Sequence, residues 1–230
     1  MTAERVPPSR IGRLRLPTLC LITDRQQCGE MGIEAVVREA VDGGVNVVQI
    51  REKDLPARDL FALGMRLREI TRGKALLLVN DRVDVAQACG ATGVHLPESG
   101  LPTPMARWVL GRNALVGCSV HGVEAAVQAE ADGADLVQLG TVFASPSKPD
   151  SAPVGVKLLR EVVDAVSIPV LAVGGVTPEN AAEVIAAGTA GAAVISAICR
   201  AGDPKAVAKA LVDAMTEAWN RRAAGKEAKA

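Results

Sequence analysis

Three polar side chains at alternating positions stand out in the segment VVQIREK, residues 47 to 53. Gln49, Arg51 and Lys53 would point to one side of an extended chain, because side chains alternate along a strand. Two cations and an amide on one side suit the binding of a polyanion. A solvated strand end, whose charges merely cover the edge of a sheet, accounts for the same pattern equally well.

A carboxylate follows the next apolar run, in LLLVND at residues 76 to 81. Asp81 could hold Mg²⁺ against phosphate oxygens, since this ion prefers carboxylate and phosphate ligands. Asn80 and Asp81 also suit the start of a helix, where short polar side chains accept hydrogen bonds from free backbone N–H groups. Both interpretations stay open at this point.

Adjacent glycines follow a further apolar run, in PVLAVGGVTPEN at residues 169 to 180. Gly174 and Gly175 allow close approach of the backbone to a ligand, and the N–H groups of a following helix suit an anion. We expect Thr177 to cap that helix, with Pro178 at its first position. An ordinary turn between a strand and a helix explains the two glycines as well.

The connection GTVFASPSKPDSAPV, residues 140 to 154, is long for a loop between a strand and a helix. It carries Ser145, Ser147 and Lys148, which favours a functional lid, although a mobile surface loop is the alternative. His121 follows another predicted strand, where it could transfer protons or cap a helix. His95 lies inside a strand, and a hydrogen-bonded interior histidine is the favoured interpretation.

Eight apolar runs alternate with amphipathic segments and define the expected fold. The predicted strands are residues 19–23, 45–50, 75–79, 93–96, 115–119, 136–139, 170–173 and 191–195. Eight βα units in about 200 to 250 residues match an α/β fold of the single (βα)8 TIM barrel type, with polar residues of the strand ends around one mouth. We expect the barrel over residues 17–220, with tails at 1–16 and 221–230. An open doubly wound sheet is the alternative, but the first strand lacks a G-x-G-x-x-G turn.

Composition excludes several classes of partner. Among 230 residues, 26 Lys and Arg balance 26 Asp and Glu, and aromatic residues make up 2%. Neither a basic footprint nor a set of stacking aromatics therefore favours nucleic acid. Charges and glycines interrupt the apolar runs, so we expect no membrane span or signal peptide. Five widely spaced cysteines suit buried thiols in a cytoplasmic protein.

Several motifs together resemble the thiamine phosphate synthase and thiazole tautomerase family of barrels. They are LCLITDR at 19–25, VVQIREK at 47–53, LLVNDRVDVA at 77–86, GVHLP at 93–97, VGCSVH at 116–121, QLGTVFASPSKPD at 138–150, PVLAVGGVTPEN at 169–180 and AAVISAI at 192–198. The resemblance extends from about residue 18 to 215. It implies a transferase of thiamine biosynthesis that acts on small phosphorylated substrates and that forms a homo-oligomer.

The resemblance also implies a role for each matching position. Hydroxymethylpyrimidine diphosphate would be bound by Gln49, Arg51, Lys53, Asn80, Ser119 and Lys148, with Arg51 and Lys148 also stabilising the departing diphosphate. Mg²⁺ would be the cofactor and Asp81 its ligand. The thiazole phosphate would be bound by Ser145, Ser147, Gly175, Ile195 and Ser196. Ser145 and Ser147 stand where the family usually has threonines.

One departure from the family pattern separates two enzyme hypotheses. The synthase pattern VHLGQ-x-D ends on a second metal-binding aspartate, whereas VHLPESG places Gly100 there. Glu98 would be the substitute ligand. The HLP form and His121 resemble the tautomerase branch, in which this histidine transfers a proton. Because Gln49, Lys53, Asn80 and Asp81 are retained, we expect a synthase, with a tautomerase and a non-catalytic phosphate-binding barrel as alternatives.

Overall fold

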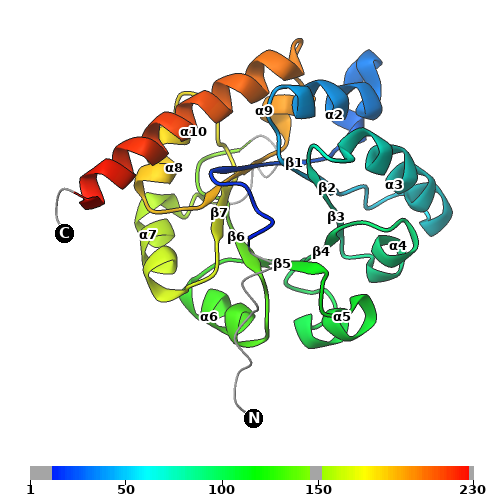
Figure 1. Ribbon diagram of the computed structural model, residues 1–230, viewed down its shortest axis with the longest axis horizontal. Helices are drawn as coiled ribbons and strands as arrows, with labels where there is room; N and C mark the ends of the chain where they lie inside the picture. Colours follow the sequence, from blue (N-terminus) through cyan, green and yellow to red (C-terminus); the bar gives the residue numbers. More distant parts are fainter. Residues whose placement is uncertain (1–11, 146–151, 228–230) are drawn as a thin grey trace.

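Eight parallel strands close into a barrel in sequence order, from β1 to β8 (Figure 1). The computed structural model describes residues 12–145 and 152–227. The strands are β1 Thr18–Ile22, β2 Val47–Ile50, β3 Leu76–Asn80, β4 Gly93–Leu96, β5 Leu115–Val120, β6 Leu136–Gly140, β7 Val170–Val173 and β8 Gly191–Val194. The predicted (βα)8 barrel is confirmed, and the open sheet is excluded because β8 pairs with β1.

Helices surround the barrel and connect successive strands (Figure 1). They are α2 Gly32–Asp42, α3 Ala57–Thr71, α4 Val83–Ala88, α5 Thr103–Leu110, α6 Val123–Ala131, α7 Gly155–Ala165, α8 Ala181–Ala186, α9 Ser196–Cys199 and α10 Pro204–Glu227. Two 3₁₀ turns, η1 Arg25–Gln27 and η2 Gly29–Met31, follow β1. The helix α10 continues past residue 220, where we expected the barrel to end. The turns after β1 and the short helix α9 were not predicted.

The predicted start of the helix after β7 is wrong. Its first residue is Ala181 and its N-cap is Asn180, so Thr177 is not the cap and Pro178 is not the first helical residue. The Asn180 side chain accepts a hydrogen bond from the Thr177 N–H at 2.9 Å and donates one to the Gly175 carbonyl at 2.9 Å. These bonds organise residues 175–180 as a turn, which competes with an earlier helix start.

Side-chain alternation along the strands divides the core into two layers. Residues such as Leu19 and Leu21 face the surrounding helices, whereas Cys20 and Ile22 face the inside of the barrel. The inner layer also contains Leu14, which precedes β1 and is buried. The segment that carries Leu14 crosses the end of the barrel where the strands begin (Figure 1). Leu14 therefore extends the apolar packing of the barrel interior to this end.

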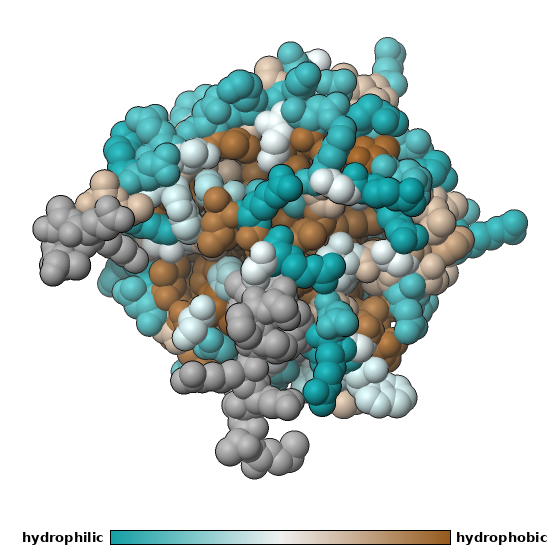
Figure 2. Space-filling view, in the orientation of Figure 1, coloured by the Kyte–Doolittle hydropathy of each residue, from teal (hydrophilic) through white to brown (hydrophobic). Residues whose placement is uncertain are grey.

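The surface follows the same division. Figure 2 shows hydrophilic residues on the outer rim of helices and hydrophobic residues nearer the barrel.

All five cysteines are buried and none forms a disulfide, as predicted. Burial raises the pKa of the Cys20 thiol to about 12, although a hydrogen bond from Gln138 opposes the shift. Within the described residues, no helix is long and apolar enough to cross a membrane.

Candidate active site at the carboxyl ends of the strands

Amide side chains from three strands meet inside the barrel. Gln138 of β6 donates a hydrogen bond from Nε2 to Oε1 of Gln49 in β2, at 2.9 Å. Gln49 Nε2 in turn donates to Asn80 Oδ1 in β3, at 3.4 Å. Both glutamines are buried, so these bonds compensate for the loss of water around the amides. The structure thus brings together two predicted residues and adds Gln138, which sequence reasoning missed.

A neutral histidine lies beside this amide chain. His95 of β4 pairs in register with Asn80 on one side and Gly117 on the other, and its Nε2 lies 2.9 Å from Ser119 Oγ. Complete burial lowers the pKa of His95 to about 3, and the positive charge of Arg51 adds to the shift. The ring is therefore uncharged near neutral pH, and the prediction of a hydrogen-bonded interior histidine is confirmed.

Glycine at position 117 makes room for that ring. A Cβ atom at Gly117 would lie 2.8 Å from His95 Nδ1, closer than such atoms approach. His95 Nδ1 is itself buried without a hydrogen-bond partner among the described residues. The imidazole is consequently held by packing on one edge and by Ser119 on the other.

The three alternating polar residues around β2 do not share one environment. Gln49 is buried inside the barrel, Arg51 is half-buried just past the strand, and Lys53 is exposed. The strand ends at Ile50, so the alternation does not continue to Lys53. The Arg51 N–H donates to Thr23 Oγ1 at 3.0 Å, which ties this turn to the end of β1.

Glu52, between the two cations, has a structural role that the sequence did not reveal. Its carboxylate is buried and accepts hydrogen bonds from Thr23 Oγ1 at 2.6 Å and from the Arg25 N–H at 3.1 Å. The Arg25 guanidinium also contacts Glu52 Oε2 at 3.2 Å. These bonds fix the backbone on either side of Arg51 and Lys53.

The carboxylate of Asp81, the predicted metal ligand, lies at the same end of the barrel as Arg51. Asp81 is exposed at the end of β3, in a left-handed conformation with φ 64° that Asp adopts more readily than most residues. Its N–H donates to the His95 carbonyl at 2.9 Å, and its carboxylate forms no ion pair with another described residue. A Cβ atom at Gly100 would lie 3.0 Å from Asp81 Oδ1, so position 100 adjoins this carboxylate.

His121 and Glu98 approach each other across the same mouth. His121 Nδ1 lies 2.6 Å from the Gly140 carbonyl oxygen, and because a carbonyl only accepts, Nδ1 carries the proton. Nε2 of the neutral ring is then an acceptor, and it lies 3.7 Å from Glu98 Oε2. The imidazole is about half exposed, which leaves Nε2 accessible to a small molecule.

Two turns follow neighbouring strands on the other side of the mouth. Val173 of β7 pairs with Ala193 of β8, so Gly174-Gly175 and Ile195-Ser196 begin within two residues of this pair. Gly174 and Gly175 have φ of 99° and 64°, which glycine adopts without strain. A Cβ atom at Gly175 would lie 2.4 Å from the Ala144 carbonyl oxygen. The turn after β7 thus packs directly against the loop after β6.

The loop after β6 is described only in part. Ser145 is half-buried, while Ser147 and Lys148 lie outside the described residues. The two ends of the loop are joined by hydrogen bonds from the Val154 N–H to the Thr141 carbonyl and from the Gly155 N–H to the Val142 carbonyl. The remaining predicted site residues lie in the last residues of strands or follow them, at one end of the barrel. A polar ligand there would meet amides, Arg51, Asp81 and the glycine turn.

Comparison with known proteins gives a consistent result. The chain matches the family model described as thiamine monophosphate synthase over residues 19–198. It is 47% identical over 195 residues to the thiamine-phosphate synthase of Roseiflexus castenholzii. The aligned region covers 84% of this chain and 86% of that protein. The thiamine-phosphate synthase of Moorella thermoacetica is 44% identical over 200 residues, covering 86% of this chain and 95% of that protein.

A solved structure supports the same assignment. The thiamine phosphate pyrophosphorylase of Pyrococcus furiosus superposes with a TM-score of 0.82 at 38% identity, covering 90% of this chain and 98% of that one. The family model covers well over half of the sequence, and the relatives align along most of both chains. The chain therefore belongs to the thiamine monophosphate synthase family.

Proposed function

We propose that this chain is a thiamine-phosphate synthase, a transferase that joins hydroxymethylpyrimidine diphosphate to (carboxy)thiazole phosphate and releases diphosphate. The observation that carries this proposal is the position of two different anion-binding features at one mouth. The amides of Gln49 and Asn80 lie near the ends of β2 and β3 with Arg51 just past β2, and the Gly174-Gly175 turn follows β7. Two phosphorylated substrates bound at these features would meet between them.

In the proposed reaction, the C–O bond between the pyrimidine methylene and the diphosphate breaks, and its electron pair leaves with the diphosphate. The thiazole nitrogen then donates its lone pair to the methylene carbon and forms the new C–N bond. From carboxythiazole phosphate, the carboxylate is also lost as CO₂, and its bonding electrons remain on the ring. Arg51 and Lys148 would stabilise the negative charge of the leaving group, since fixed cations oppose charge that develops in the transition state. Gln49, Lys53, Asn80 and Ser119 would orient the pyrimidine diphosphate.

Neutral His95 supports this arrangement without adding charge. Because Nε2 of His95 lies 2.9 Å from Ser119 Oγ, it fixes the direction of that hydroxyl. An uncharged ring also avoids the repulsion that a buried imidazolium would exert on Arg51.

The thiazole phosphate would be bound on the opposite side of the mouth by Ser145, Ser147, Gly175, Ile195 and Ser196.

Mg²⁺ fits this site as a cofactor shared with the substrate. The ion commonly binds proteins through one or two carboxylates and completes its shell with phosphate oxygens and water. Asp81 is exposed and offers such a carboxylate, whereas no three His, Cys, Asp or Glu side chains gather into a metal site in the described part of the chain. When bound, the ion would neutralise negative charge on the diphosphate. Glu98 would be a second ligand.

The geometry of His121 favours one alternative, a thiazole tautomerase that moves a proton on carboxythiazole phosphate. With Nδ1 held by the Gly140 carbonyl, Nε2 would accept the substrate proton, and Glu98 would stabilise the resulting imidazolium. In this alternative, Glu98 acts on the histidine and not on a metal.

A growth test distinguishes the two enzymes. The chain is expressed in a bacterial strain that lacks its own thiamine-phosphate synthase, on medium without thiamine. We expect the wild type and His121→Ala to restore growth and Arg51→Ala to fail, with equal protein levels checked by immunoblot. Absence of growth with the wild-type chain would contradict the synthase.

A further inference from the structure

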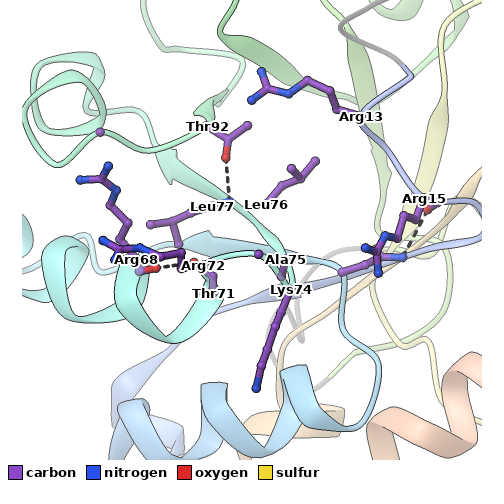
Figure 3. A pocket seen from close by; sticks show the side chains of 13 residues that line it. Arg13, Arg15, Arg68, Thr71, Arg72, Lys74, Ala75, Leu76, Leu77 and Thr92 are labelled. Atoms are coloured by element: carbon purple, nitrogen blue, oxygen red, sulfur yellow. Dashed lines mark hydrogen bonds between the residues drawn. The ribbon is translucent and has the colours of Figure 1, made fainter.

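A cavity of about 380 Å³ lies at the opposite end of the barrel from the proposed active site (Figure 3). Its floor contains Leu76 and Leu77, the first residues of β3, and Thr92, which precedes β4. The proposed active site lies at the carboxyl ends of these strands. The two sites are therefore separated by the length of the barrel strands.

Five cationic side chains line this cavity, and no acidic residue does. They are Arg13, Arg15, Arg68, Arg72 and Lys74. Over the whole sequence, acidic and basic residues are equal in number at 26 each, so this concentration of one sign is local. In Figure 3, Arg13 and Arg15 reach the cavity from one side of Leu76 and Leu77, and Arg68 and Arg72 from the other.

Among the residues that the structure describes, carboxylates outside the lining pair with only two of the five cations. Arg72 pairs with Glu69 at 2.5 Å, and Lys74 pairs with Asp42 at 2.8 Å. Arg13, Arg15 and Arg68 form no ion pair with any other described residue. Arg13 donates one hydrogen bond to the Asn113 carbonyl at 2.9 Å, which holds the side chain in place without cancelling its charge.

The dipole of α3 accounts for only part of the cluster. This helix ends at Thr71, and cations near a helix C-terminus are stabilised by its partial negative charge, which explains Arg68 and Arg72. Arg13 and Arg15 come from the segment before β1, more than 50 positions away in the sequence, and serve no such role. Bringing these like charges together costs free energy unless an anion balances them.

The lining is also suited to hydrogen bonding with phosphate. A guanidinium offers paired donors that match phosphate oxygens, and three such groups lack a carboxylate partner. The Thr92 hydroxyl accepts a hydrogen bond from the Leu77 N–H at 3.2 Å, so its own proton can point to a ligand. The volume falls in the range of small-molecule sites, roughly 300 to 1,000 Å³.

We propose that this cavity binds a small molecule with at least two linked phosphate groups. Guanidinium groups on both sides of the cavity would contact different phosphates of one ligand. The proposal does not depend on the proposed function of the mouth, because the two sets of residues have no member in common.

The test is calorimetric titration of the full chain with inorganic diphosphate, in buffer containing a chelator. Arg51→Ala protein is used throughout, so that binding at the mouth is weakened. We expect the further change Arg15→Ala with Arg68→Ala to weaken binding by about ten-fold or more, from the loss of charge-assisted hydrogen bonds. Arg160→Ala with Arg221→Ala removes the same charge from exposed helix positions outside this cavity and should leave the affinity within about two-fold.

Three further titrations complete the test. Arg13→Gln leaves α3 intact and should also weaken diphosphate binding, which keeps the test valid if the double variant unfolds. Inorganic phosphate should bind at least about ten-fold more weakly than diphosphate, because one phosphate contacts fewer arginines. With ATP, an affinity equal to that of diphosphate would indicate a polyphosphate ligand, and a higher one a nucleotide. Undetectable diphosphate binding, or equal binding in the cavity and control variants, would overturn the proposal.

Discussion

At the scale of single residues, His95 combines a structural and an electrostatic role. The ring is completely buried, and its pKa falls to about 3, first through burial and then through the charge of Arg51. In the unfolded chain, the same group titrates at an ordinary value near 6.5. Between these values the unfolded state binds more protons than the folded state, so stability decreases as pH falls.

We therefore expect the free energy of unfolding to decrease between pH 6.5 and 4.5, with His95 contributing on the order of 2 kcal/mol. His95→Gln should reduce this dependence, because the amide cannot be protonated in that range but can still contact Ser119. Urea unfolding at the two pH values measures the difference. His121→Gln, at the exposed histidine, is the matched control. An unchanged dependence in His95→Gln would show that another group causes the acid sensitivity.

Among the residues that the structure describes, Arg51 is the cation that would stabilise the leaving diphosphate in the proposed mechanism. Replacement by alanine should lower kcat by about 100-fold or more, the typical effect of losing one donor to developing charge. Stability should change by less than about 1 kcal/mol, since half-exposed cations contribute little to folding. Steady-state kinetics and urea unfolding test both parts, with Arg160→Ala as the control. A near-normal rate in Arg51→Ala would remove this residue from the mechanism.

At the scale of elements, the turn after β7 is constrained on two sides. Gly175 has φ of 64°, and a Cβ atom there would lie 2.4 Å from the Ala144 carbonyl oxygen. Its own carbonyl accepts a hydrogen bond from Asn180 at 2.9 Å. A change at this position therefore affects both the turn and the loop after β6.

Gly175→Ala should destabilise the protein by about 1 to 3 kcal/mol through backbone strain and displacement of the loop. It should also raise the KM for thiazole phosphate more than the KM for pyrimidine diphosphate. Gly202→Ala is a matched control, because nothing lies within 4 Å of a Cβ atom there and φ is not positive. Equal effects on both KM values would argue against a thiazole phosphate site at this turn.

The turns after β3 and β4 bring position 100 next to Asp81. In Gly100→Asp, the added carboxylate would lie close to Asp81 Oδ1 and repel it without a metal. We expect this variant to need less Mg²⁺ for half-maximal activity, and to gain more thermal stability on Mg²⁺ addition than the wild type. Some loss of stability is also expected, because the new Cβ atom would lie 2.8 Å from Pro97 Cδ.

Gly100→Asn has a similar size without the charge and separates this steric effect from metal binding. If the aspartate and asparagine variants respond equally to Mg²⁺, position 100 does not adjoin the metal site.

At the scale of the whole molecule, the barrel was predictable because each strand is a short apolar run bounded by glycine or polar residues. The bounds of β4 and β7 agree with the prediction residue for residue. The four-residue helix α9 is too short to produce a helical period, and the Asn180 side chain holds residues 175–180 in a turn, so α8 begins later than predicted. Both features depend on local hydrogen bonds that hydrophobic patterning does not record.

Contacts across the barrel were beyond prediction from sequence patterns. Gln49 and Gln138 are 89 positions apart, and each appears only as a polar residue within a strand. Likewise, Arg13 and Arg15 precede the barrel and gave no sign that they would join Arg68 at a cavity. The mouth itself was predictable, because residues that follow parallel strands must lie at one end of the barrel.

The most direct test of the proposed function is an assay of the purified chain with hydroxymethylpyrimidine diphosphate and carboxythiazole phosphate, first with Mg²⁺ and then with a chelator. We expect thiamine phosphate, diphosphate and CO₂ in equal amounts with Mg²⁺, and none of these products with the chelator. Isomerised thiazole phosphate formed equally in both conditions, without coupled product, would contradict the synthase and support the tautomerase. Binding of thiazole phosphate without any product would contradict both enzymes and indicate a non-catalytic barrel.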